Sequence, residues 1–364
     1  MNVAISCDSL LERNHANEIV EMICEAFPDS MIYCLVHREK AILGTIEQRR
    51  IVSTGLSRKV VTENDLYRYL PMLPSLVQQM APSCQHNLLI NISRGFSHGF
   101  KKCDKTKQIT YLYELSFQKH FDKWWKKLFR AFITNKFINA LKQVDLLLVS
   151  NETLQKDLEK LGIKSTVLVP PFRLSDYALF PKSMFKHDFY TVDTRGLTLA
   201  EVDQLKEFFI NRQVRFQFVG PDLHLETLKK DGPENRFFGE RCSGEHAPVL
   251  ASSRAFISFD TVMFPKMPLA AMAVGRPIVV LETQKESLSG TGVHYLKGFN
   301  LKELGSILDQ IDQGHDDFDG QKIRANVMKY HDIKFKAALK RILDKELGLS
   351  NEPLNADQLI STTL

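Results

Sequence analysis

The sequence predicts an α/β protein built from two parallel-sheet domains in tandem. Short apolar runs alternate with segments of helical periodicity along most of the chain, which indicates sheets covered on both faces by helices. The chain has 364 residues, more than one hydrophobic core usually serves. The pair Pro170-Pro171 and an aperiodic stretch after it separate two such alternating series. We therefore expect two domains with a cleft between them, where ligands commonly bind.

The first alternating series occupies residues 1–172. Its first strand is expected at Val3–Ser6 and is expected to end there, because Cys7-Asp8-Ser9 interrupts the apolar pattern. The remaining expected strands are Met31–Val36, Arg50–Ser53, Asn87–Ile92, Ile109–Tyr113, Val144–Ser150 and Thr166–Val169. The expected helices are Ala16–Ala26, Tyr67–Met80, Phe129–Val144 and Asn151–Leu161, the third with Phe129, Phe132, Ile133, Phe137, Ile138 and Leu141 on one side.

The second series occupies residues 188–333, after an expected linker at 173–187. Its expected strands are Phe189–Val192, Arg215–Val219, Arg236–Gly239, Ala255–Phe259 and Ile278–Leu281. Its expected helices are Leu199–Ile210, Leu223–Lys230, His246–Ser252, Leu269–Val274 and Leu301–Ile311. A final helix is expected at Phe335–Leu347, within residues 334–349, and the polar residues 350–364 are expected to form a loosely held tail.

Composition places the chain among globular proteins, with 44% hydrophobic and 25% charged residues. The net charge of +5 is uneven, because Lys101–Lys142 contains eleven Lys or Arg residues and only three acidic ones. The N-terminus lacks the pattern of a signal peptide, and no run reaches the roughly 18 apolar residues that span a bilayer. We expect a cytoplasmic protein, at most peripheral at the inner face of a membrane.

Cysteines and histidines give no sign of a metal site. The six cysteines are scattered without a Cys-x-x-Cys pair, which predicts reduced, structural thiols and no disulfide framework. His98 and His120 are expected to be surface histidines.

A basic, aromatic segment lies at Phe117–Phe132. In it, basic residues alternate with large apolar ones, and the most informative are Lys123, Trp124, Trp125, Lys126, Lys127 and Arg130. Such a helix suits the headgroup layer of an anionic membrane. The alternative is a helix that packs on its own domain with a solvated lysine face. Nucleic acid is not expected as a partner, because no binding motif accompanies the charge.

The stretch Phe256–Leu281 predicts a strand, a loop, a short helix and a second strand. Pro268 is expected at the first helical position and Gly275 just after the last one. The N-terminus of such a helix is a ready site for a phosphate. The alternative is an ordinary buried crossover.

Five segments resemble, in the same order, motifs of the retaining glycosyltransferases of family 4. They are VDLLLVSNETLQKDLEKLGIKSTVLVPPF (144–172), VRFQFVGP (214–221), NRFFGE (235–240), FPKMPLAAMAVGRPIVV (264–280) and SGTGVHY (289–295). In the first domain, RRIVSTGLSR and NLLINISRGFSHGFK resemble members that add mannose or related sugars to bacterial surface polysaccharides. The resemblance covers nearly the whole chain.

The resemblance implies a GT-B architecture, in which two Rossmann-like domains face a central cleft and a C-terminal helix crosses back to the first domain. It implies a retaining hexosyltransferase that uses a GDP- or UDP-linked sugar as co-substrate, without a metal, and a glycan or lipid-linked acceptor in surface polysaccharide or lipopolysaccharide biosynthesis. The implied donor-side residues are Arg195, Gly220, Gly239, Asp260, Thr261, Phe264, Pro268, Ala270 and Glu282. No catalytic residue is assigned.

The chain departs from the family pattern at its charged positions. The two glutamates of the family fall at Val262 and Ala270, its lysine at Ala200 and its first-domain histidine at Tyr113. The glycine loop after the first strand is replaced by Asp8–Ala16. Each lost charge-assisted hydrogen bond is worth about 1.5–3 kcal/mol. The sequence therefore leaves a second hypothesis open, a catalytically inactive GT-B protein that binds a glycan, a lipid or a partner.

Overall fold

The structure of the chain is a computed structural model that describes residues 2–115, 124–181, 184–185, 188–220, 236–238, 243–262, 264–314 and 318–347. Within residues 124–129, 236–238, 243–244 and 346–347 only the backbone is described. The chain divides into two compact units. Unit 1 comprises Met1–Pro170 and Phe335–Leu364, and unit 2 comprises Pro171–Lys334.

The described residues of unit 1 form a seven-stranded sheet in the order β3-β2-β1-β4-β5-β6-β7, in which every neighbouring pair is parallel. The strands are β1 (Val3–Leu10), β2 (Met31–His37), β3 (Ile51–Ser53), β4 (Leu88–Ser93), β5 (Lys107–Leu112), β6 (Leu146–Val149) and β7 (Thr166–Val167). The strand order reverses between β1 and β4, which makes this the topological switch point of a doubly wound sheet.

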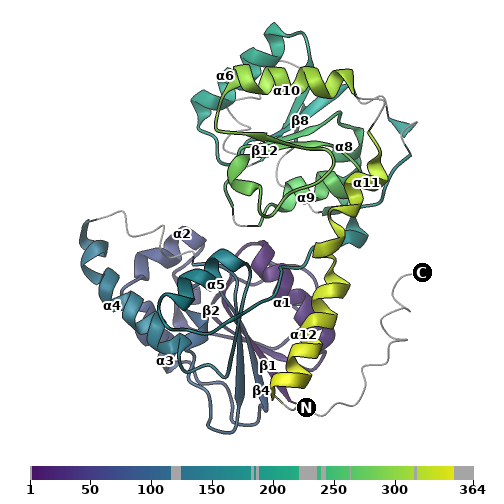
Figure 1. Ribbon diagram of the computed structural model, residues 1–364. Coiled ribbons are helices and arrows are strands. Elements are labelled where there is room, and N and C mark those ends of the chain that lie inside the picture. Colours follow the sequence, from purple (N-terminus) through teal and green to yellow (C-terminus); the bar gives the residue numbers. More distant parts are fainter. Residues whose placement is uncertain are drawn as a thin grey trace. The chain divides into compact units, whose positions relative to one another are not determined.

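Helices cover both faces of this sheet (Figure 1). The described helices are α1 (His15–Ala26), α2 (Glu63–Leu66), α3 (Leu73–Gln79), α4 (Trp124–Leu141), α5 (Glu152–Glu159) and the last helix, α12 (Asp332–Leu347). α1 and α12 lie on one face, and α3 and α4 lie on the other. Phe335 of α12 meets Tyr111 edge-on at 5.8 Å, and Lys336 pairs with Glu25 of α1 at 3.4 Å. The predicted return of the C-terminal helix to the first domain is confirmed.

The described residues of unit 2 form a six-stranded parallel sheet in the order β10-β9-β8-β11-β12-β13. The strands are β8 (Phe189–Asp193), β9 (Arg215–Val219), β10 (Arg236–Phe238), β11 (Phe256–Ser258), β12 (Ile278–Leu281) and β13 (Val293–Leu296). The described helices are α6 (Leu199–Asn211), α8 (Ser243–Ser252), α9 (Lys266–Ala273), α10 (Leu301–Gln313) and α11 (Gly320–Ala325). α6 and α10 cover one face and α8 and α9 the other (Figure 1). The switch point lies between β8 and β11, and the predicted α/β fold of two doubly wound sheets is confirmed.

Several element boundaries differ from the sequence prediction; the helix predicted at Tyr67–Met80, for example, is only Leu73–Gln79. Two of the differences have a clear physical reason. β1 continues through Asp8 to Leu10, beyond the end predicted at Ser6, because neighbouring backbone N–H groups satisfy the Asp8 carboxylate. α9 starts at Lys266, so the prediction of Pro268 as its first residue is wrong. Leu269 N–H already donates to Pro265 C=O, and a proline in the first turn costs little because its N–H would have no helical partner.

Two expectations about side-chain placement are also wrong. Phe132, predicted on the same side of the helix as Ile133, Phe137 and Leu141, is 46% exposed, whereas those three residues, spaced four apart, form the buried stripe of α4. His98, expected at the surface, is 2% exposed.

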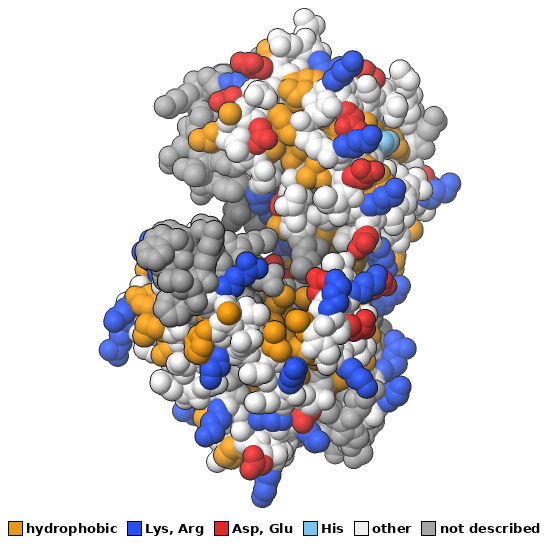
Figure 2. Space-filling view, turned by 60° about the vertical axis from the view of Figure 1, so that its left-hand side comes forward, with side chains coloured by type: hydrophobic (Ala, Val, Ile, Leu, Met, Phe, Trp, Pro, Cys, Tyr) orange, Lys and Arg blue, Asp and Glu red, His pale blue; other side chains and the backbone are white. Residues whose placement is uncertain are grey.

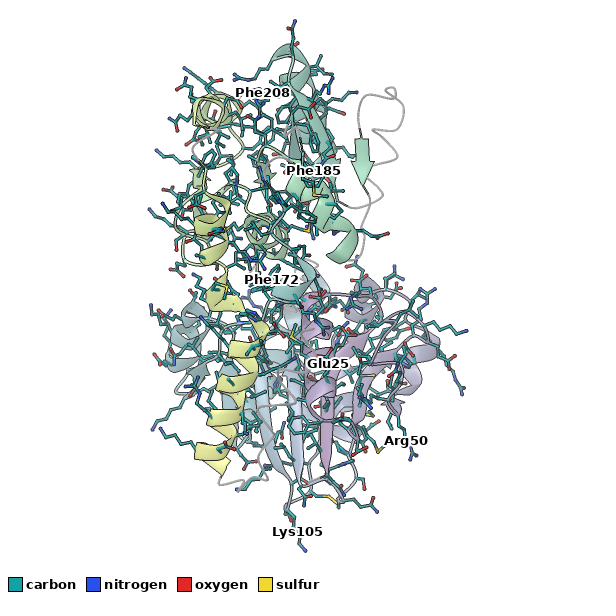
Figure 3. All side chains as sticks on the ribbon, turned by 90° about the vertical axis from the view of Figure 1, so that its right-hand side faces the viewer. Glu25, Arg50, Lys105, Phe172, Phe185 and Phe208 are labelled. Atoms are coloured by element: carbon teal, nitrogen blue, oxygen red, sulfur yellow. A yellow bond between two sulfur atoms is a disulfide. The ribbon has the colours of Figure 1, made fainter. Side chains whose placement is uncertain are left out.

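The cysteine prediction is wrong for one pair. Cys84 and Cys103 form a disulfide with a Cα–Cα separation of 5.4 Å. It joins the loops that precede β4 and β5, and the second of these loops also carries the outward-pointing Lys105 (Figure 3). Scattered spacing could not reveal this pair, because the parallel register of β4 and β5 brings the two loops together. Cys7, Cys24 and Cys34 are free and buried, and Cys242 lies outside the described residues.

The segment predicted as a linker contributes to the core of unit 2. Phe172, labelled in Figure 3, stacks on Tyr177 with ring centroids 5.1 Å apart, and both side chains are buried, as is Leu174. Phe172 also forms an isolated bridge with His331. The predicted helix Leu223–Lys230 and the predicted tail 350–364 lie outside the described residues.

Candidate functional site

The two switch points identify where ligands are expected. In open parallel α/β sheets, ligands bind beyond the carboxyl ends of the strands where the strand order reverses. We call the residues beyond β1 and β4 edge 1, in unit 1, and those beyond β8 and β11 edge 2, in unit 2. Each edge carries a group of polar side chains.

At edge 2, an arginine is held by the last residue of β8. Arg195 donates from Nε and Nη2 to the carboxylate of Asp193, at 3.0 and 2.8 Å, and its backbone N–H donates to the same carboxylate at 3.1 Å. Asp193 is 1% exposed, whereas the Arg195 side chain is 34% exposed. This bidentate pairing fixes the guanidinium in one orientation. The predicted role of Arg195 as a diphosphate ligand stays a prediction.

Glycines let the loops of edge 2 approach closely. Gly196 has φ +80°, and a Cβ there would lie 2.9 Å from the carbonyl oxygen of Phe259, in the loop after β11. Gly220, at the end of β9, has φ +147°, and a Cβ there would overlap the Thr194 hydroxyl. Both positions therefore require glycine. The need for glycine at position 220 is explained by the nearby Thr194. That Gly220 faces a sugar donor stays a prediction.

Asp260 and Gln284 shape the loop that follows β11. Asp260 accepts the N–H of Val262 at 3.1 Å. Burial raises the pKa of Asp260, and the nearby Asp193 carboxylate raises it further, against the opposing charge of Arg195. Gln284, which follows β12 and is 6% exposed, donates from Nε2 to the Val262 carbonyl at 2.8 Å. The sequence analysis did not identify Gln284, because no sequence pattern indicates that a glutamine side chain is buried and bonds to a distant loop.

The remaining predicted donor-side residues differ widely in exposure. Thr261 and Glu282 are exposed, whereas Pro268 is buried within α9. Phe264 is buried and meets Tyr330 edge-on at 5.7 Å. Ala270 is fully buried. Gly239 lies outside the described residues.

The exposure differs between Val262 and Ala270, the two positions that align with glutamates of the family that the sequence resembles. Val262 is 41% exposed and Ala270 is 0% exposed. A longer side chain at Val262 extends into solvent, whereas one at Ala270 has no open space. The departure from the family pattern at Ala270 is thus built into the packing of α9.

At edge 1, a carboxylate from β1 fills a group of backbone N–H donors. Asp8 accepts from the N–H groups of Arg94, Phe96 and Ser97 at 2.7, 3.2 and 2.5 Å. These donors belong to the turn that follows β4. Burial raises the pKa of Asp8, and the Ser97 and Arg94 N–H groups oppose that rise.

Next to this turn, one guanidinium lies between two carboxylates. Arg94 Nε is 2.7 Å from Glu114 Oε1, and Arg94 Nη1 is 3.5 Å from Glu63 Oε1. Ser9 donates its hydroxyl to Glu63. Burial raises the pKa of Glu63, and the Arg94 charge opposes the rise. All three charged side chains keep 14–21% of their surface exposed, so the group is reachable from solvent.

A histidine and a tyrosine complete edge 1. His15, the first residue of α1, places Nδ1 3.0 Å from the hydroxyl of Tyr113, which follows β5. Tyr113 occupies the position of the family's histidine, so an imidazole reaches the same edge from another segment. Sequence reasoning considered Asp8 and Tyr113 only as departures and missed His15. Arg94 and Glu114 lie shortly after predicted strands, and this position in the sequence could have indicated edge 1.

The basic segment of the sequence lies partly in α4. Trp124, Trp125, Lys126 and Lys127 belong to its first turns, where side chains are not described, and Lys123 lies outside the described residues. Arg130 is exposed. Figure 2, which brings the α4 side of unit 1 forward, shows hydrophobic side chains mixed with Lys and Arg on this face.

A small, partly open cavity of about 30 Å³ lies beside α4. Its lining comes from α3, α4 and the turn after β4, and includes Val77, Phe96, Ile133 and Lys136. Lys136 also stands over the ring of the exposed Phe132, with Nζ 5.9 Å from the centroid. No helix in the described part of the chain is both long and apolar enough to cross a membrane.

Two doubly wound units in tandem, with the last helix packed on the first unit, define the GT-B architecture of glycosyltransferases. Solved structures agree with this assignment. HepE from Anabaena, in complex with UDP, aligns with a TM-score of 0.68 and 12% identity over 94% of this chain and 100% of its own.

Two further solved structures show the same likeness. Sucrose-phosphate synthase from Thermosynechococcus elongatus aligns with a TM-score of 0.70 and 10% identity, over 96% of this chain and 100% of its own. A glycosyltransferase from Rickettsia africae aligns with a TM-score of 0.61 and 11% identity, over 96% and 99%. No protein-family model and no curated protein matches the chain. The likeness establishes the fold.

Proposed function

We propose that the protein is a glycosyltransferase that moves a hexose from a UDP- or GDP-linked sugar to a glycan or lipid-linked acceptor. The observation that supports this proposal most strongly is the pair Arg195 and Asp193 at edge 2, which lies at the switch point of the second sheet of a GT-B fold. Solved structures with this fold include HepE in complex with UDP and with UDP-glucose. The motif resemblance to family 4 and its mannosyltransferase-like members supports the same donor class.

At edge 2, we assign the donor contacts by chemistry. Arg195, oriented by Asp193, faces the diphosphate, where a cation stabilises the leaving group. Gly220 lets the backbone approach the donor, and Asp260 accepts a sugar or ribose hydroxyl. Gly239 and the exposed Thr261 and Glu282 complete the donor side. Phe264, Pro268 and Ala270 are buried and support the donor side from behind through the packing of α9. The transfer proceeds with retention and needs no metal.

At edge 1, we assign the acceptor. Glu63 and Glu114 are carboxylates that accept hydrogen bonds from sugar hydroxyls, and Arg94 holds them in place. We place the reaction in the assembly of a surface polysaccharide or lipopolysaccharide, at the cytoplasmic face of a membrane. The motifs RRIVSTGLSR and NLLINISRGFSHGFK support this setting.

We propose that α4 contacts an anionic membrane surface. The exposed Arg130 and Phe132 and the excess of basic residues in Lys101–Lys142 support this contact. Flotation with liposomes that contain anionic lipid tests it. Replacing Trp124 and Trp125 by Ala should release the protein, and unchanged flotation would refute membrane contact through α4.

A second candidate is a catalytically inactive GT-B protein that binds a glycan, a lipid or a partner. The burial of Ala270 and the pairing of Arg195 with a carboxylate favour it, because both reduce the charge available to a donor. Release of UDP or GDP from a panel of nucleotide sugars, followed by mass spectrometry of added glycan acceptors, separates the two. Transfer to an acceptor supports the enzyme. Donor binding without product on any acceptor supports the inactive protein.

A further inference from the structure

Edge 1 holds two features that usually bind anions, and in each of them a side chain of this chain accepts from backbone N–H groups. Backbone N–H groups in a turn beyond a strand, and the N-terminus of the helix after β1, are the common phosphate sites of Rossmann-like domains. Here Asp8 occupies the turn after β4. Asn14 caps α1 by accepting the Asn17 N–H at 3.0 Å. At the turn after β4, an external anion therefore meets N–H donors that already bond to Asp8.

The fit of the Asp8 carboxylate is close. Oδ1 accepts from Phe96 and Ser97, and Oδ2 accepts from Arg94, so both oxygens are held by backbone donors. Asp8 is 6% exposed. A phosphate that approached the same N–H groups would have to expel a carboxylate that is attached to the strand beside them and carries like charge.

Two described arginines that follow β1 and β4 do not restore an anion site. Arg94 is shared between Glu63 and Glu114, so its single charge faces two carboxylates. Arg13, in the loop after β1, donates to Glu21 at 2.8 Å. With Asp8 added, the carboxylates around edge 1 outnumber these guanidinium groups, which repels a negatively charged ligand.

We propose that Asp8 determines acceptor specificity, so that edge 1 takes an uncharged, hydroxyl-bearing sugar and refuses a phosphorylated or carboxylated one. That the ligand of edge 1 is an acceptor rests on the proposed function. That edge 1 excludes anions rests on the contacts of Asp8. The ligand that fits is a neutral glycoside whose hydroxyls donate to Glu63 and Glu114. Asp8 itself acts as a built-in anion that keeps the turn after β4 closed.

The experiment compares inorganic phosphate, methyl α-mannoside and mannose 6-phosphate as ligands of the full chain. In the wild type, amide chemical shifts of Arg94, Phe96 and Ser97 should not respond to phosphate. The neutral sugar should bind at least about tenfold more tightly than its phosphate. In Asp8→Ala, the same three amides should shift on phosphate addition. Asp8→Ser, which keeps one short acceptor, serves the same purpose if Asp8→Ala does not fold.

Phosphate-dependent shifts of these amides in the wild type would overturn the proposal, and so would their absence in a folded Asp8 variant. The control is Asn14→Ser, which retains a capping oxygen and should leave the turn after β4 unresponsive to phosphate. Transfer activity is measured separately. An Asp8 variant that gains phosphate binding in a protein that transfers no sugar would support the exclusion of anions and contradict the proposed function.

Discussion

Introducing a glutamate at Val262 or Ala270, the two positions that align with glutamates of the family that the sequence resembles, tests whether packing explains their absence here. In Ala270→Glu, the new side chain starts from a position with no exposed surface. Overpacking costs about 1–3 kcal/mol, and a buried, unpaired carboxylate costs several kcal/mol more. We expect a loss of about 4 kcal/mol or more, a large part of the roughly 5–15 kcal/mol that stabilises a typical domain.

Val262→Glu is the matched control, because the same side chain is added to a position that is 41% exposed. It should change the free energy of unfolding by no more than about 0.5 kcal/mol. Urea denaturation followed by circular dichroism measures both variants. If Ala270→Glu were as stable as Val262→Glu, the space around α9 would be open. The packing account of the lost glutamate would then be refuted.

Three further predictions concern single contacts. Gln284→Leu removes the hydrogen bond to the Val262 carbonyl and should cost about 0.5–1.5 kcal/mol in urea denaturation; an unchanged midpoint would show that this bond does not brace the loop. Burial lowers the pKa of His98 to about 4 from 6.5, so between these pH values the unfolded chain binds a proton that the native state does not. Stability should fall by up to about 3 kcal/mol as pH drops through this window, and His98→Gln should remove that part, which Tm measured from pH 7.5 to 4.5 would detect. Cys84→Ser opens the 19-residue link to Cys103 and should cost about 3 kcal/mol; equal Tm values for the variant and the oxidised wild type would contradict a stabilising disulfide.

The fold could be predicted because local patterns agree with tertiary structure along most of the chain. β9 and β12 have the predicted bounds, since each is a short apolar run ended by polar or glycine residues. β13 was missed, because Val293–Leu296 is only partly buried and lacks a clear apolar run. β1 was cut short at Ser6 because a carboxylate inside a buried strand is costly unless donors from another segment satisfy it. The donors to Asp8 are the N–H groups of Arg94, Phe96 and Ser97, which follow β4 more than 80 residues later. No local sequence pattern predicts this contact.

The candidate site was predicted only in part for the same reason. Arg195, Gly220 and Asp260 could be proposed from the sequence because each follows a predicted strand or lies within a motif, and the structure places all three at edge 2; their roles stay predictions. Edge 1 was not found, because its side chains come from segments far apart in the sequence. Glu63 and Arg94, for example, meet only when the parallel order of the strands is known.

A nucleotide-sugar site at edge 2 is tested most directly by calorimetric titration of the full chain with UDP-glucose, GDP-mannose, UDP and GDP. At least one nucleotide sugar should bind with a Kd below about 1 mM, which corresponds to a binding free energy of roughly −4 kcal/mol. Arg195→Ala should weaken that binding, whereas Arg130→Ala, on α4, should leave it unchanged. The absence of binding by every nucleotide at millimolar concentration would contradict a nucleotide-sugar site at edge 2.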